Sequence, residues 1–236
     1  MSLLRIQDVM HGAPVIPVLV VRDLQVAQPL AEALLEGGLP YLEVTLRSDC
    51  ALAAIEAMAQ LPGVVVGAGT VRSAADLLAS AQAGAAFAVS PGLPPALLEA
   101  PRPIPLLPGV MTPTEVMRAS DAGFRALKLF PARVAGGVDA LKAFAGPLPD
   151  IEFCPTGGVG EDDMARYLAL PNVPCVGGSW LAPDDLIARR DWAAITERAR
   201  RAVAIACGRP AQASHPADPL AGDGGEDPGS ALEELR

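Results

Sequence analysis

Lysine and histidine are among the scarcest residues in this 236-residue chain. The two lysines, Lys128 and Lys142, stand against sixteen arginines, so the chain uses arginine wherever a cation only has to be solvated or paired. The two histidines, His11 and His215, leave little material for a histidine-based zinc site or catalytic triad. A lysine kept in such a composition is a candidate for chemistry that arginine cannot perform, because arginine stays protonated.

Long apolar runs and an excess of positive charge are also missing. No stretch approaches the roughly 18 uninterrupted apolar residues of a membrane span. The N-terminal sequence has acidic and polar interruptions and no cleavage site for a signal peptide. We therefore expect a cytoplasmic protein outside the membrane. The formal net charge of −9 and the few lysines argue against binding to nucleic acid.

Disulfide and metal-binding cysteine patterns are absent as well. The four cysteines, at positions 50, 154, 175 and 207, are far apart and form no CxxC pair. Three of them lie in apolar surroundings. The spacing therefore predicts buried, free thiols in a reducing compartment.

Short apolar runs alternate with amphipathic segments along residues 14–207. The runs predicted as strands are Val15–Val21, Tyr41–Leu46, Val64–Gly69, Ala86–Ser90, Ile104–Gly109, Ala126–Phe130, Ile151–Pro155 and Val173–Gly177. The predicted helices are Ala27–Glu36, Ala51–Leu61, Ala74–Ala83, Pro113–Ala122, Gly137–Ala145, Asp162–Ala169 and Trp192–Ala206. Eight βα units in about 200 residues predict a single-domain α/β fold over residues 1–207, a (β/α)8 TIM barrel. A doubly wound open sheet is the alternative, but no GxGxxG follows the first strand to favour it.

The composition changes after Cys207. Residues 208–236 are rich in Pro, Gly, Ala and acidic residues and have almost no β-branched or aromatic residues. Six acidic residues against Arg209 and Arg236 supply −4 of the net charge of −9. Such a segment cannot bury enough apolar surface to offset the entropy of ordering, so we predict a disordered acidic tail.

Two predicted strands carry charged residues where a barrel interior is expected. Strand alternation places Glu43 and Thr45 on one face of the second strand, and Lys128 and Phe130 on one face of the sixth. A rim ion pair between Glu43 and Arg47 is the structural alternative. If both faces line the interior, an amine and a carboxylate share one water-poor cavity. These are the parts of Schiff-base chemistry, in which the amine condenses with a ketone and the carboxylate moves protons.

Glycine-rich turns follow several predicted strands. Gly157-Gly158 and Gly177-Gly178 follow the last two strands, where TIM barrels usually bind phosphate through backbone amides. Simple tight turns are the alternative. Thr70, after the third strand, is suited either to donate to a carboxylate or to cap a helix.

These residues lie in motifs that resemble one family, the 2-keto-3-deoxy-6-phosphogluconate (KDPG) aldolases and their 4-hydroxy-2-oxoglutarate (KHG) aldolase relatives. The motifs are EVTLR (43–47), VGAGT (66–70), SPG (90–92), PGV-T (108–112), KLFPA (128–132), GGV-ALKA (136–143), FCPTGG (153–158) and VGGSWL (176–181). The resemblance implies a class I aldolase on a (β/α)8 barrel, usually a homotrimer, that needs no metal or cofactor. Its substrate would be a phosphorylated 2-keto acid, cleaved to pyruvate and glyceraldehyde 3-phosphate; KHG shares the pyruvyl half, so the preference stays open.

The same resemblance implies a role for each matched residue. Lys128 would be the Schiff-base lysine and Glu43 the general acid and base. The implied substrate-binding residues are Arg47 and Thr70 at the carboxylate, Pro91 and Phe130 as pocket walls, Thr156 nearby, and Gly157, Gly158, Gly178 and Ser179 around the phosphate.

Two other functions remain open from the sequence. A phosphosugar epimerase or isomerase would use Lys128 only as an electrostatic clamp, although the shortage of histidine argues against a metal-dependent version. A catalytically silent barrel would bind a phosphorylated ligand and contact a partner through the acidic tail, but Lys128 and Glu43 would then be an unexplained electrostatic cost.

Overall fold

The computed structural model describes residues 4–208 of the chain. The predicted tail, residues 208–236, lies outside the described residues except for Gly208. Within residues 4–208, none of the helices combines the length and the apolar character needed to cross a membrane.

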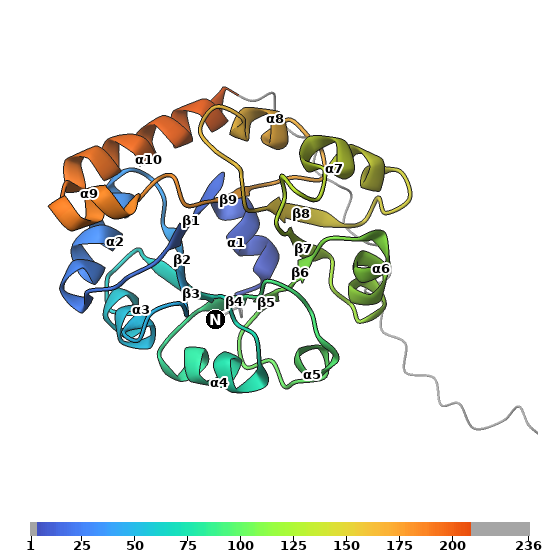
Figure 1. The fold of residues 1–236 in the computed structure, drawn as a ribbon, viewed down its shortest axis with the longest axis horizontal. Helices are drawn as coiled ribbons and strands as arrows, with labels where there is room; N and C mark the ends of the chain where they lie inside the picture. Colours follow the sequence, from blue (N-terminus) through green and yellow to red (C-terminus); the bar gives the residue numbers. More distant parts are fainter. Residues whose placement is uncertain (1–3, 209–236) are drawn as a thin grey trace, which may run out of the picture.

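Short parallel strands form two sheets (Figure 1). The strands are β1 (Val15–Leu19), β2 (Tyr41–Thr45), β3 (Val65–Gly69), β4 (Phe87–Val89), β5 (Leu106–Leu107), β6 (Gly109–Val110), β7 (Ala126–Leu129), β8 (Glu152–Pro155) and β9 (Val176–Gly178). The larger sheet has the order β5-β4-β3-β2-β1-β9 and the smaller one β6-β7-β8, with every pairing parallel. An isolated parallel bridge between Thr156 and Gly177 joins the end of β8 to β9. The predicted α/β class with parallel strands is therefore confirmed.

Helices surround these strands, and in this view one further helix, α1, is seen inside the ring of strands (Figure 1). The helices are α1 (Ile6–Gly12), α2 (Ala27–Glu36), α3 (Ala51–Ala59), α4 (Ala74–Gln82), α5 (Pro95–Leu98), α6 (Pro113–Asp121), α7 (Gly137–Ala145), α8 (Met164–Leu168), α9 (Asp184–Arg189), α10 (Trp192–Cys207) and the 3₁₀ turn η1 (Leu24–Val26). Sequence patterns predict α2 and α7 with these bounds and do not predict α1, α5, α9 or η1.

One predicted strand is interrupted. The run Ile104–Gly109 forms two short strands, β5 and β6, on either side of Pro108. Proline has no N–H to donate to a ladder, so the strand breaks there. The Pro108 carbonyl still accepts a hydrogen bond from the Lys128 amide at 2.9 Å, which holds β7 beside the break.

Polar side chains cap several of the helices. Ser73 accepts a hydrogen bond from the Asp76 amide at the start of α4. Thr112 and Glu115 form a reciprocal capping box at the start of α6, with the three-residue spacing typical of this motif. Asp23 caps the turn η1, through the Gln25 amide, and not α2 itself.

Alternation along the strands separates two apolar regions. Leu42 and Val44 of β2 and Leu127 and Leu129 of β7 belong to the larger one, between the strands and the outer helices. The smaller one, called here the inner cluster, consists of Ile6, Val9, Met10, Ile16, Phe87, Val89, Leu107, Ala126, Cys154 and Cys175. The strands therefore have an outer face toward the helices and an inner face that packs around α1.

Cysteine burial differs from the prediction at two positions. All four cysteines are free, and Cys154 and Cys175 are buried in the inner cluster. Cys50 is half-buried, and Cys207 is exposed at the end of α10.

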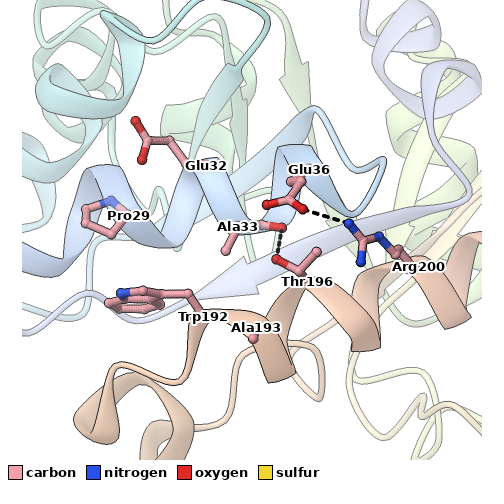
Figure 2. Close-up of a pocket in the computed structure, with 8 residues that line it drawn as sticks. All are labelled: Pro29, Glu32, Ala33, Glu36, Trp192, Ala193, Thr196 and Arg200. Atoms are coloured by element: carbon pink, nitrogen blue, oxygen red, sulfur yellow. Dashed lines mark hydrogen bonds and ion pairs between the residues drawn. The ribbon is translucent and has the colours of Figure 1, made fainter.

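The long helix α10 packs against α2 on the outside of the fold (Figure 2). The buried Thr196 hydroxyl donates to the Ala33 carbonyl at 2.9 Å, and Arg200 pairs with Glu36 at 2.7 Å. Gly37 lies so close to α10 that a Cβ there would be 2.3 Å from the Cβ of Ala199. The last helix is thus tightly joined to the first βα unit.

Candidate active site

Lys128 and Glu43 form an ion pair on the inner face. Lys128 lies in β7 and Glu43 in β2, which belong to different sheets. The Lys128 Nζ donates to Oε1 of Glu43 at 3.2 Å and to Oε2 at 3.4 Å. Only 5% of Lys128 and 3% of Glu43 is exposed. Glu43 is thus paired with Lys128 across the interior, and the alternative pairing with Arg47 is wrong.

Gly69 of β3 makes room for the Glu43 carboxylate. A Cβ at Gly69 would lie 2.3 Å from Oε1, 2.6 Å from Cγ and 2.8 Å from Cδ of Glu43. The missing side chain lets the carboxylate lie against the β3 backbone and reach Lys128. Sequence reasoning missed this contact, although Gly69 is part of the motif VGAGT.

Stability alone does not explain a charged pair in this position. Burying an ion pair costs several kcal/mol of desolvation per charge, and well-packed apolar replacements are often at least as stable. The neighbouring positions in register are apolar or thiol-bearing, since Lys128 is paired with Cys154 of β8. An amine within hydrogen-bond distance of a carboxylate in a buried interior is the arrangement needed for a nucleophilic amine with its own base.

Arg47 is positioned through Thr45. Thr45 is 1% exposed, and its hydroxyl donates to the Leu19 carbonyl at 2.8 Å and accepts from Arg47 Nε at 3.1 Å. Arg47 itself is exposed. Within residues 4–208 its terminal Nη groups make no hydrogen bond, so they are available to an anion. Thr45 was placed on the inner face by alternation, but its contact with Arg47 was not predicted.

Thr70 and Pro91 lie in the loops after β3 and β4. Thr70 has a φ of +59°, which is uncommon for a residue with a branched side chain. It does not cap a helix, because Ser73 caps α4. Pro91 is exposed, and its backbone lies against Gly109, where a Cβ would be 2.4 Å from the Pro91 carbonyl carbon.

The loops after β7 and β8 are packed together. Phe130 follows β7, and its ring centroid is 5.2 Å from Lys128 Nζ. The peptide bond from Phe130 to Pro131 is cis. Across the loop, a Cβ on Gly157 would be 3.2 Å from the Phe130 ring. Gly157 and Gly158 have φ values of +92° and +81°, which explains glycine at both positions.

Thr156 connects this loop pair to β9. It is 6% exposed, and its Oγ1 would lie 2.2 Å from a Cβ on Gly177. Gly178 lies against the Trp180 ring, and Ser179 is exposed. The structure thus brings Lys128, Glu43, Phe130 and Gly157 into one contact chain, with Thr156 beside β9.

A separate surface pocket between α2 and α10 contains none of these residues (Figure 2). Its charged lining residues are Glu32, Glu36 and Arg200, which are exposed. Its buried hydroxyl, that of Thr196, already donates to the Ala33 carbonyl, and no buried amine or carboxylate lines the pocket. The buried Lys128–Glu43 pair is therefore the stronger candidate for an active site. Within residues 4–208, no three His, Cys, Asp or Glu side chains gather into a set that could hold a metal ion.

Comparison with known proteins shows which family the chain belongs to. Residues 6–198 match the family model described as KDPG and KHG aldolase. The 2-dehydro-3-deoxy-phosphogluconate aldolase of Pseudoalteromonas atlantica is 51% identical over 86% of this chain and 95% of its own length. The KHG/KDPG aldolase of Escherichia coli K12 is 48% identical over 84% of this chain and 94% of its own.

A solved structure extends the comparison. The KDPG aldolase from Legionella pneumophila, with pyruvate captured as a covalent carbinolamine intermediate, superposes with a TM-score of 0.81. It is 44% identical and covers 83% of this chain and 96% of its own. These matches span the strands and loops that carry Lys128 and Glu43, and the chain therefore belongs to the KDPG and KHG aldolase family.

Proposed function

We propose that the protein is a class I aldolase that cleaves KDPG to pyruvate and glyceraldehyde 3-phosphate, and KHG to pyruvate and glyoxylate. The observation that carries the proposal is the buried contact of 3.2 Å between Lys128 Nζ and Glu43. The names of the relatives supply the substrate class, because both substrates have the same pyruvyl half.

In the proposed mechanism, Lys128 passes a proton to Glu43 and attacks the C2 ketone of the substrate. Glu43 then gives this proton to the hydroxyl of the carbinolamine, which leaves as water, so that an iminium ion forms and Glu43 is again a carboxylate. The iminium accepts the electron pair released when the C3–C4 bond breaks. Glu43 takes the proton of the C4 hydroxyl, so the C4 fragment leaves as an aldehyde. Glu43 then gives this proton to C3 of the enamine, and hydrolysis of the resulting iminium releases pyruvate and restores the amine. No step requires a metal or a cofactor.

The loop residues would hold the two ends of the substrate. Arg47, oriented by Thr45, and Thr70 would bind the carboxylate next to the ketone. Pro91 and Phe130 would form pocket walls, with Thr156 near the substrate. The residues that would cradle the phosphate are Gly157, Gly158, Gly178 and Ser179, in the turns after β8 and β9.

We also propose that the two sheets close into one (β/α)8 barrel, with β5 and β6 as a single strand. The bridge between Thr156 and Gly177 supports closure on one side. On the other side, β5 and β6 are separated only by Pro108. Residues 1–207 would be this single domain, followed by the acidic tail 208–236. A homotrimer in the cytoplasm is the expected assembly and location, and sedimentation would test the trimer.

Trapping with borohydride tests the covalent step. Incubation with pyruvate and sodium borohydride should attach a pyruvate-derived group to Lys128, which peptide mass spectrometry locates. The variant Lys128→Met should not form this adduct, whereas Lys142→Met, at the other lysine, should form it as the wild type does. Absence of an adduct on Lys128 in the wild type would overturn the proposal. Release of pyruvate from KDPG and KHG, measured side by side, gives the substrate preference.

A further inference from the structure

Arg133 lies in the loop after β7, against the turn proposed to bind phosphate. Its amide donates to the Gly157 carbonyl at 3.0 Å, and the Ala132 amide donates to the Thr156 carbonyl at 2.8 Å. These two bonds fix the loop after β7 on the loop after β8. The position of the Arg133 backbone relative to the glycine pair is therefore set by the fold.

The Arg133 side chain runs across Gly158. A Cβ on Gly158 would lie 2.6 Å from the Arg133 Cβ, 3.1 Å from Nε and 3.2 Å from Cδ. Any other residue at position 158 would push the arginine away. Glycine at position 158 therefore serves two purposes: it adopts the left-handed backbone conformation of the turn, and its missing side chain leaves space for the aliphatic part of Arg133.

The N–H donors of the Arg133 guanidinium are not used in hydrogen bonds within residues 4–208. Its Nη2 lies 3.6 Å from Asp163 Oδ2, an ion pair that is longer than a hydrogen bond. Within residues 4–208 the Arg133 side chain makes no hydrogen bond, and 70% of it is exposed. Asp163 instead accepts a short bond from the Gly160 amide at 2.7 Å, which holds the carboxylate beside the turn. Asp163 thus directs the guanidinium without occupying its donors.

The buried Tyr167 phenol adds no competing negative charge. Burial, followed by the nearby Asp163 carboxylate, raises the pKa of Tyr167 above its usual value, while Arg133 and Arg166 oppose the shift. The phenol is therefore neutral near pH 7, and Arg133 keeps a positive charge that is only loosely paired.

We propose that Arg133 contacts the phosphate of the substrate and sets the preference for phosphorylated over unphosphorylated 2-keto acids. This inference rests on the proposed aldolase function. Backbone amides at the glycine pair supply partial charges, whereas a guanidinium supplies a full charge and a planar, bidentate fork that matches phosphate. Arg133 would therefore act at the phosphate end of the substrate, as Arg47 would at the carboxylate end.

The test compares KDPG with KHG, which has no phosphate. In Arg133→Met, which keeps an apolar stem over Gly158, the ratio of kcat/KM for KDPG to that for KHG should fall about tenfold, given the worth of an exposed charge-assisted hydrogen bond. Arg133→Lys should recover part of the loss, since the charge returns without the fork. The control is Arg189→Met, because Arg189 of α9 is also exposed and pairs with Asp185 at 3.1 Å. It should keep the wild-type ratio.

Salt dependence supplies a second readout. Raising the ionic strength should lower the wild-type KDPG preference, because exposed charges are screened, and should change that of Arg133→Met much less. The inference would be overturned if Arg133→Met kept the ratio and the salt response of the wild type. It would also be overturned if the wild-type protein cleaved KHG but not KDPG. Failure of the wild type to cleave either substrate or to trap pyruvate would instead refute the proposed function.

Discussion

Replacing Gly69 with alanine tests whether the position of the Glu43 carboxylate controls the reaction. The backbone at Gly69 lies outside the left-handed region, so alanine is compatible with its conformation. The added Cβ, however, would lie 2.3 Å from Oε1 of Glu43. Ordinary contacts begin at 3.4 Å, and 3.4 minus 2.3 is 1.1 Å. The carboxylate must therefore retreat by that distance, away from β3.

The expected magnitude follows from this displacement. A catalytic group misplaced by about 1 Å can cost about 100-fold in rate, which corresponds to about 2.7 kcal/mol of transition-state stabilisation. Lys128 is not displaced directly in Gly69→Ala, so its amine should still attack a ketone, although more slowly because Glu43 also takes the Lys128 proton. Proton transfer at C4 should suffer most, and kcat for KDPG cleavage should fall about 100-fold.

The assay pairs turnover with trapping. Gly69→Ala should still form the pyruvate adduct with borohydride while it releases pyruvate from KDPG slowly. Gly146→Ala is the matched control, because a Cβ at Gly146 would meet no atom within 4 Å. Thermal unfolding of both variants checks that the fold is intact. A folded Gly69→Ala enzyme with kcat within about threefold of the wild type would refute the reasoning, because the required geometry would then not depend on Gly69.

Three further changes test other contacts. Thr45→Val removes the acceptor for Arg47 Nε, so KM for KDPG should rise about tenfold with little change in kcat, and Thr45→Ser should restore it; equal losses in both variants would contradict a positioning role. At Glu115, desolvation is the largest single influence, but three hydrogen bonds together lower the pKa of the carboxyl. The charged form therefore stabilises the fold above the unfolded pKa, and this is lost as pH falls through the lower folded pKa. Glu115→Ala should lower the free energy of unfolding by about 1 kcal/mol at pH 7 and by progressively less as the pH falls through the lowered folded pKa, as measured by urea unfolding; a gap that stays constant with pH would contradict this. Gly37→Ala would place a Cβ 2.3 Å from that of Ala199 and should destabilise the protein by about 1–3 kcal/mol in urea without lowering kcat; an unchanged unfolding midpoint would count against the tight packing of α2 on α10.

The central pair could be predicted because strand alternation is a local property. Leu42 and Val44, and likewise Leu127 and Leu129, mark one face of each strand, so the opposite face of Glu43 and Lys128 follows from the period of two. The bounds of α2 and α7 also follow from local periodicity. The direct contact between Glu43 and Lys128, by contrast, depends on how the two sheets meet, which no local pattern specifies.

Short elements and long-range contacts escape such reasoning. The helices α5 and α9 span four and six residues, too few for a helical period to be recognised. The helix α1 is stabilised by contacts with distant strand residues such as Ile16 and Phe87. The positive φ of Thr70 has no sequence signal, because a branched residue rarely adopts it. Proline in a predicted strand did carry a signal for the break at Pro108.

The helix α1 determines how molecules reach the proposed reaction centre. Its residues Ile6, Val9 and Met10 are buried in the inner cluster, and His11 at its end pairs with Glu152 at the start of β8, at 2.9 Å. The helix α1 thus closes the interior at the end where the strands begin, which leaves the carboxyl ends of the strands as the open side. In the proposed reaction, the substrate would therefore enter, and both products would leave, at the carboxyl ends of the strands.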